Sequence, residues 1–158
     1  MFMLVIVCGL PGTGKSFVAE IVAEKLGAAL LRTDAIRKTL FPRPAYTEEE
    51  KTKVYEEMFR LATEKLAEGN VVLDAVFPRE SLRKQALSLS KDAVILRTAC
   101  NKNTANKRLS GKRPLSDADY NVYLKIKEEF EPIKEKHLTV NTDLPKAEVK
   151  EKIYSIFA

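Results

Sequence analysis

The clearest chemical pattern in the sequence is GLPGTGKS at residues 9–16, which matches G-x-x-x-x-G-K-[ST] in full. Glycines let the backbone turn successive N–H groups toward phosphate oxygens, and a helix that follows directs its positive N-terminus at the same anion. Lys15 adds a mobile positive charge, and the Ser16 hydroxyl is suited to ligate Mg²⁺. A tight turn without a ligand, which is the alternative, would not require this lysine and hydroxyl. The residues expected to contact a nucleotide are Gly9, Gly12, Thr13, Gly14, Lys15, Ser16 and Phe17.

A second pattern, TDAIR, contains Asp34 and Arg37 and follows a short apolar segment. Helical positions i and i+3 share a face, so both side chains are expected to point into one cleft. A carboxylate there can orient a hydroxyl group and accept its proton, and an arginine can hold an anionic acceptor through two hydrogen bonds. The alternative is that Asp34 caps a helix and Arg37 is a solvated neighbour.

Asp74 ends the apolar segment VVLD, which is the pattern of a strand whose carboxylate holds Mg²⁺ directly or through water. We therefore expect Ser16 and Asp74 to form the metal site, the alternative for Asp74 being a strand-end turn residue. Arg79 and Arg83 lie just beyond and could reach a substrate, but a solvated helix face is the favoured interpretation for both.

Residues 93–116 carry six basic side chains and no acidic one. A window of one sign beside a phosphate site predicts a small basic lid over about residues 101–116. Such a lid would bring arginine to the transferred phosphate and exclude water, and Arg108 and Arg113 are the favoured arginines. The alternative is a basic surface loop.

Apolar segments alternate with segments of helical periodicity, which predicts βαβ units and a parallel sheet with helices on both faces. Ligands bind outside the carboxyl ends of the strands in such sheets, so the patterns above share one edge. We expect one domain over residues 1–158, with no repeat or linker. The predicted strands are 2–8, 28–32, 71–74, 93–99 and 138–141, and the predicted helices cover about 16–26, 34–40, 47–69, 80–89, 104–109, 116–131 and 145–157.

Composition narrows the class of protein further. The chain has 158 residues, 45% of them hydrophobic and 31% charged, with a net charge of +5, which excludes a disordered chain. No apolar run reaches the roughly 18 residues of a membrane span. Cys8 and Cys100 form no metal or disulfide pattern and are expected to be core or near-core thiols, and a cytoplasmic location is expected. His137, the single histidine, excludes sites that need two, and we expect it to be structural.

The segments GLPGTGKS, RTDAIRK, VVLDAVFPRESLR and ANKRLSGKRPLSDAD together resemble the small P-loop kinases related to polynucleotide 5′-kinase, a group that includes zeta-toxin-like kinases and seryl-tRNA kinase. The resemblance implies a P-loop NTPase fold with strand order 2-3-1-4-5. It implies that Lys15 and Ser16 bind ATP and Mg²⁺, that Asp34 is the general base, and that Arg37 contacts a phosphate of the acceptor. It places the lid arginine on Arg108 or Arg113.

These observations predict a kinase that moves the γ-phosphoryl group of Mg-ATP to a hydroxyl acceptor, with a nucleic-acid 5′-hydroxyl as one candidate. A small metabolite, a nucleoside or an aminoacyl-tRNA is the nearest alternative. An interaction module that binds and slowly hydrolyses ATP is the alternative from another class. Tyr46, Tyr55 and Phe59 are candidates to border the acceptor site, although Phe59 fits core packing better.

Overall fold

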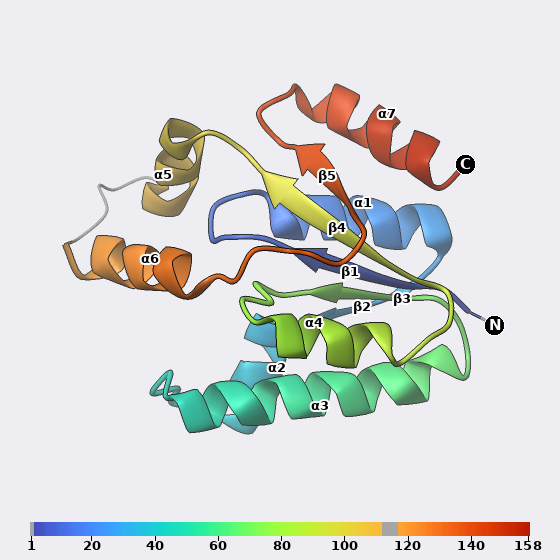
Figure 1. Ribbon diagram of the computed structural model, residues 1–158, viewed down its shortest axis with the longest axis horizontal. Helices are drawn as coiled ribbons and strands as arrows, with labels where there is room; N and C mark the ends of the chain where they lie inside the picture. The colour runs from blue at the N-terminus through green and yellow to red at the C-terminus, as the bar shows by residue number, and fades with distance from the viewer. Residues whose placement is uncertain (1, 112–116) are drawn as a thin grey trace.

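The computed structural model describes residues 2–111 and 117–158, with the backbone alone at 117–120 (Figure 1). The predicted cap Ser116 and the lid residue Arg113 lie outside the described residues. Five parallel strands form one sheet in the order β2-β3-β1-β4-β5, as the resemblance implied. They are β1 (Leu4–Cys8), β2 (Ala29–Arg32), β3 (Val71–Asp74), β4 (Ala93–Ala99) and β5 (His137–Asn141).

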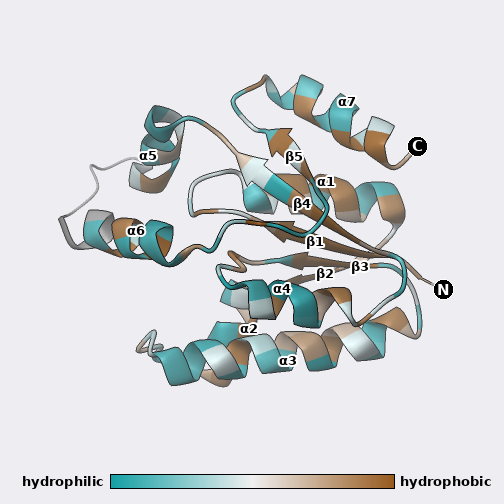
Figure 2. Cartoon of the chain, in the orientation of Figure 1, coloured by the Kyte–Doolittle hydropathy of each residue, from teal (hydrophilic) through white to brown (hydrophobic). Residues whose placement is uncertain are grey.

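The continuous apolar runs become the central strands because helices cover them on both faces. Every residue of β1 and β3 is buried, and Figure 2 shows these strands as the most hydrophobic part of the chain. In register, Ile6 of β1 lies opposite Leu73 of β3 and Ile95 of β4. The sheet therefore provides the rigid layer whose carboxyl edge positions the site.

Seven helices are described in these parts of the chain. One face of the sheet packs against α3 and α4, and the other packs against α1 and α7. In Figure 1, α5 and α6 lie beyond the carboxyl ends of the strands, where the glycine-rich loop also lies. The helices are α1 (Lys15–Leu26), α2 (Thr33–Leu40), α3 (Glu48–Leu66), α4 (Glu80–Leu87), α5 (Lys102–Ser110), α6 (Asp117–Glu129) and α7 (Lys146–Ile156).

The predicted start of α3 and the predicted end of α1 are confirmed, because each has a capping residue next to it in the sequence. The Thr47 side chain accepts a hydrogen bond from the Glu50 backbone N–H at 3.2 Å, which caps α3. The Glu50 carboxylate accepts the N–H groups of Ala45 and Tyr46, so it fixes the loop before the helix. Gly27 ends α1 in the left-handed conformation, at φ +58°. No helix in the described ranges is long and apolar enough to cross a membrane.

Two expectations about side chains are wrong. Arg83 is fully buried instead of lying on a solvated face. Its guanidinium donates to the carbonyl oxygens of Phe77 at 2.8 Å and Glu131 at 3.1 Å, so tertiary contacts satisfy a group that the local pattern left to water. Tyr55 does not border an open site: it is buried, and its hydroxyl accepts the Phe77 N–H at 3.0 Å.

Candidate active site

The loop between β1 and α1 holds its shape through glycines at points of close approach. Gly12 and Gly14 have φ values of +81° and +84°, which L side chains rarely adopt. A Cβ atom on Gly12 would lie 2.8 Å from the carbonyl oxygen of Ala105 in α5. A Cβ atom on Gly14 would lie 3.2 Å from the Thr142 side chain, in the loop after β5. These positions require glycine for their conformation and for their neighbours.

Lys15, at the first turn of α1, bends back over the loop. Its ammonium group donates to the Leu10 carbonyl oxygen at 3.1 Å. Burial lowers the pKa of Lys15, and the nearby charges of Asp74 and Asp34 oppose this shift. In the sheet register, Asp74 at the end of β3 lies opposite Val7 of β1 and Arg32 of β2, so the ends of these strands and the glycine-rich loop share one edge.

Ser16 and Asp74 are brought together as predicted, and Arg32 joins them. The Asp74 Oδ2 atom accepts a hydrogen bond from Ser16 at 3.0 Å and forms an ion pair with Arg32 Nε at 3.3 Å. Arg32 in turn pairs with Glu20 at 2.6 Å. Burial raises the pKa of Asp74, although the Ser16 hydrogen bond, Lys15 and Arg32 all lower it.

The donor chemistry of this pair fits Mg²⁺. Mg²⁺ prefers hard oxygen ligands and is usually held by one or two protein oxygens together with water and substrate phosphates. Ser16 Oγ and Asp74 Oδ2 lie 3.0 Å apart at the edge of the loop, which matches such a partial ligand set. Among the described residues, no group of three or more His, Cys, Asp or Glu side chains could form an all-protein metal site.

Asp34 and Arg37 lie on one face of α2, as the spacing predicts. Arg37 NH1 contacts Asp34 Oδ1 at 3.3 Å. The Asp34 side chain is 89% exposed and that of Arg37 is 13% exposed, so the carboxylate is open to a ligand and the guanidinium is held in place. Within the described residues, Arg37 Nε is buried without a hydrogen-bond partner, and the guanidinium lies 5.1 Å from the ring centroid of Tyr46.

Arg108 of α5 reaches the glycine-rich loop. One of its nitrogens donates to the Gly12 carbonyl oxygen at 3.3 Å and to Thr142 Oγ1 at 2.9 Å. The other donates to the Thr142 carbonyl oxygen at 2.6 Å. Arg108 therefore links the predicted lid to both the phosphate loop and the loop after β5. The companion prediction, Arg113, lies outside the described residues.

Three residues that the sequence patterns did not single out complete this edge. Arg32 is the register partner of Asp74 on the neighbouring strand, so pairing of adjacent strand ends was the signal that could have found it. Thr98 Oγ1 lies 2.7 Å from Thr13 Oγ1 and supports the loop from β4. Thr142 donates to the Thr13 carbonyl oxygen at 2.8 Å. The contacts of Thr98 and Thr142 with Thr13 cross more than 80 positions of sequence, so no local pattern contains them.

A parallel sheet of this order, with a glycine-rich loop after its central strand, defines a P-loop kinase-like fold. The chain belongs to the AAA domain family, whose model matches residues 4–133. A UPF0200 protein of Aeropyrum pernix is 41% identical over 70 residues. That alignment covers 40% of this chain and 37% of the relative, so the match spans little more than a third of that protein.

Three solved structures share the fold across almost the whole chain. The gluconokinase of Sinorhizobium meliloti has a TM-score of 0.73 at 20% identity, over 97% of this chain and 90% of that chain. The Mycobacterium tuberculosis APS kinase in complex with AMPPNP and APS has a TM-score of 0.74 at 19% identity, over 99% and 97%. Kti12 of Chaetomium thermophilum in complex with ADP-AlF3 has a TM-score of 0.71 at 16% identity, over 98% and 96%. They confirm the predicted fold class and the resemblance to small P-loop kinases.

Proposed function

We propose that the protein is an ATP-dependent phosphotransferase that moves the γ-phosphoryl group of Mg-ATP to a hydroxyl acceptor. The observation that carries the proposal is the placement of Lys15, the Ser16–Asp74 pair and Asp34, which follows the end of β2, at one sheet edge. Phosphoryl transfer needs mainly positioning and charge stabilisation, and this edge supplies both in one place.

At the ATP end, the backbone amides of residues 12–16 would surround the phosphates. Lys15 would move from the Leu10 carbonyl oxygen to the β- and γ-phosphates, since a phosphate is a stronger acceptor for an ammonium group than a neutral carbonyl is. Arg108 would bring positive charge from α5. Ser16, and Asp74 directly or through water, would hold Mg²⁺, which would neutralise charge on the phosphates. Arg32 shares the Asp74 oxygen, and its charge opposes the rise that burial causes in the pKa of that carboxyl.

At the acceptor end, Asp34 would orient the hydroxyl and accept its proton. The exposed carboxylate is open to a substrate, and its contact with Arg37 fixes its direction. Arg37 would hold an anionic group of the acceptor beside Asp34. Arg113, the second lid arginine of the proposal, would act from the segment between α5 and α6.

The acceptor class that we favour is a nucleic-acid 5′-hydroxyl. Tyr46 is 61% exposed beside Arg37, and an aromatic ring paired with an arginine is a suitable surface for stacking a base. The net charge of +5 is compatible with a polyanionic acceptor. The alternative acceptors are small metabolites, nucleosides and aminoacyl-tRNA, and the experiment below compares them with the 5′-hydroxyl.

The decisive experiment is incubation with γ-labelled ATP, Mg²⁺ and separate acceptors: a 5′-hydroxyl oligonucleotide, its 5′-phosphorylated form, nucleosides, sugars and charged tRNA. Label in the 5′-hydroxyl oligonucleotide alone supports the favoured acceptor. Label in another compound corrects the acceptor and keeps the kinase. Label released only as inorganic phosphate, with every acceptor, favours an ATP-hydrolysing interaction module instead.

The Asp34→Asn variant further distinguishes a kinase from an ATP-hydrolysing interaction module. It should bind ATP with unchanged affinity and lose transfer by about 10²–10⁴-fold, which is the usual contribution of a general base. Asp92→Asn is the matched control, because Asp92 is an exposed acid in the loop before β4. Full transfer by the Asp34 variant would contradict the assignment of this residue as the base.

A further inference from the structure

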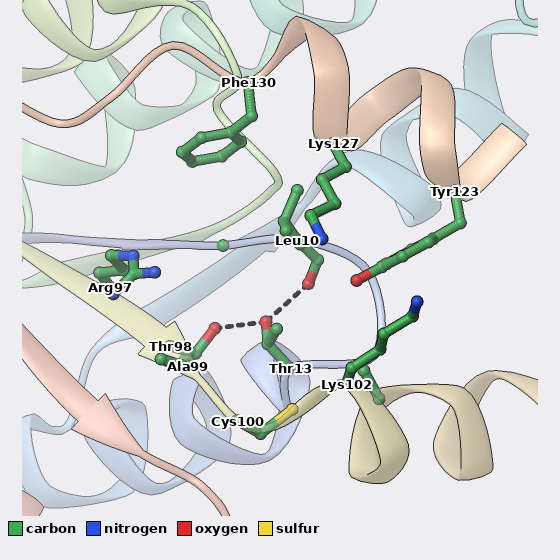
Figure 3. Close-up of a pocket in the computed structure, with 12 residues that line it drawn as sticks. Leu10, Thr13, Arg97, Thr98, Ala99, Cys100, Lys102, Tyr123, Lys127 and Phe130 are labelled. Atoms are coloured by element: carbon green, nitrogen blue, oxygen red, sulfur yellow. Dashed lines mark hydrogen bonds between the residues drawn. The ribbon is translucent and has the colours of Figure 1, made fainter.

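A cavity of about 220 Å³ lies beside the glycine-rich loop, and the proposed reaction does not use it. Its walls come from Gly9 and Leu10 of the loop, the end of β4, the start of α5, and α6 (Figure 3). The Leu10 carbonyl oxygen joins the two sites, because it accepts the Lys15 ammonium group at 3.1 Å and the Thr13 hydroxyl at 2.6 Å. The cavity therefore shares a wall with the phosphate loop and extends from it toward α5 and α6.

The charge of the cavity lining is of one sign. Arg97, Lys102 and Lys127 line it, and no Asp or Glu does. In Figure 3, Lys127 descends from α6 and Lys102 rises from α5 on the facing wall. None of the three forms an ion pair with a described side chain, whereas Arg32, Arg37 and Arg83 all do. All three are exposed side chains on the rim of one cavity, and cations without a counter-charge among the described side chains favour an anion there.

The remaining lining limits the size and character of that anion. Tyr123 is 6% exposed and its hydroxyl points from α6 toward Leu10, and the Phe130 ring lies on the other side (Figure 3). The floor is the hydroxyl pair of Thr13 and Thr98, 2.7 Å apart. Drug-sized ligands occupy pockets of about 300–1,000 Å³, so this cavity suits a phosphate group with a small organic body against the aromatic rings.

We propose that this cavity, hereafter the α6 cavity, is a binding site for a phosphate-class anion, held by Lys102, Lys127 and Arg97 with the Tyr123 hydroxyl as a further donor. Arg37 lies beyond β2, three strands away from β4, or about 14 Å at a strand spacing of about 4.8 Å. The α6 cavity is therefore a second anion site on the other side of the phosphate loop. The anion is either a phosphate of an elongated acceptor or a separate phosphorylated effector.

The test measures binding of inorganic phosphate by calorimetry, and the phosphate loop is prevented from binding that phosphate in two ways. One is saturation of the wild-type protein with Mg-AMPPNP, and the other is the Lys15→Ala variant without nucleotide. Each is combined with Lys102→Ala and Lys127→Ala together. The matched control is Lys65→Ala with Lys152→Ala, which removes the same charge from exposed positions of α3 and α7.

We expect phosphate to bind in both backgrounds, to weaken by about tenfold or more in the Lys102/Lys127 variant, and to be unchanged in the control, because each lysine contributes a charge-assisted hydrogen bond. Absence of phosphate binding in both backgrounds, or equal loss in the control, would overturn the proposal. Failure of AMPPNP to bind would instead count against the proposed kinase activity, since the Lys15→Ala arm reports on the α6 cavity without nucleotide.

Two further arms distinguish the sources of the anion. If the α6 cavity holds part of the acceptor, a phosphate monoester with a free hydroxyl is phosphorylated, and the Lys102/Lys127 variant raises its KM while kcat stays close to the wild-type value. If the cavity holds an effector, inorganic phosphate changes the rate with an unphosphorylated acceptor, and the same variant removes that change. A variant that alters neither binding nor either rate refutes the anion site.

Discussion

Replacing Arg83 with methionine should lower the free energy of unfolding by about 3–5 kcal/mol, the usual cost of removing one partner from a buried charge pair. The guanidinium has no exposed surface and donates to the carbonyl oxygens of Phe77, Glu131 and Pro132 at 2.8, 3.1 and 3.2 Å. It also lies 3.5 Å from the Glu135 carboxylate, which is 10% exposed. Methionine fills much of the volume but leaves these acceptors buried and unpaired.

Urea unfolding followed by circular dichroism measures this loss. For a chain of this size, each kcal/mol shifts the midpoint of thermal unfolding by about 2–4 °C, so a fall of about 6–20 °C should accompany it. Arg79→Met is the control, because Arg79 is 55% exposed and its contact with Glu48 is 3.7 Å long, which predicts a change below about 1 kcal/mol.

A double variant tests the physical cause. Arg83→Met with Glu135→Leu removes both charges, so the uncompensated carboxylate disappears and part of the lost stability should return. Two results would contradict this account of how the buried guanidinium holds the segment after α6. One is a free energy of unfolding for Arg83→Met within about 1 kcal/mol of the wild-type value. The other is a double variant that is less stable than Arg83→Met by the full cost of Glu135→Leu alone.

Three other outcomes follow from the same contacts. Lys15→Ala should abolish Mg-ATP binding in calorimetry, and retained affinity would contradict its place in the phosphate loop. Asp74→Asn should lose transfer yet gain stability at about pH 7, because burial raises the pKa of Asp74 and ionisation then destabilises the fold; the gain should vanish near pH 3, where the carboxyl is protonated in both states. Burial raises the pKa of Tyr55 to about 12, so wild-type stability should fall by about 3 kcal/mol as pH rises from about 10 to 12, and Tyr55→Phe should unfold with little change over that range.

Local patterns were sufficient to predict the elements that position the site. The apolar runs became β1 and β3 because burial on both faces requires apolar residues at every position. The predicted N-cap at Thr47 and the predicted C-cap at Gly27 are confirmed, because their hydrogen-bond partners lie within a few residues. Asp34 and Arg37 met through a spacing of one helical turn. In each case the interaction that decides the structure is close in sequence.

The amino-acid sequence alone determined the glycine-rich loop, the strands and helices around it, and the placement of Lys15, Ser16 and Asp74 at one edge. Only the tertiary structure decided that Arg32 shares the Asp74 carboxylate, and that Arg83 is buried although it is charged. The physical reason is that the cost of burying a charge depends on its partners, and Asp74 for Arg32 and Glu131 for Arg83 lie about 40 to 50 positions away in the chain. Helical spacing places Arg83 on the apolar face with Ala86, but two of its three carbonyl partners, Glu131 and Pro132, reach it only once the chain after α6 has folded back over α4.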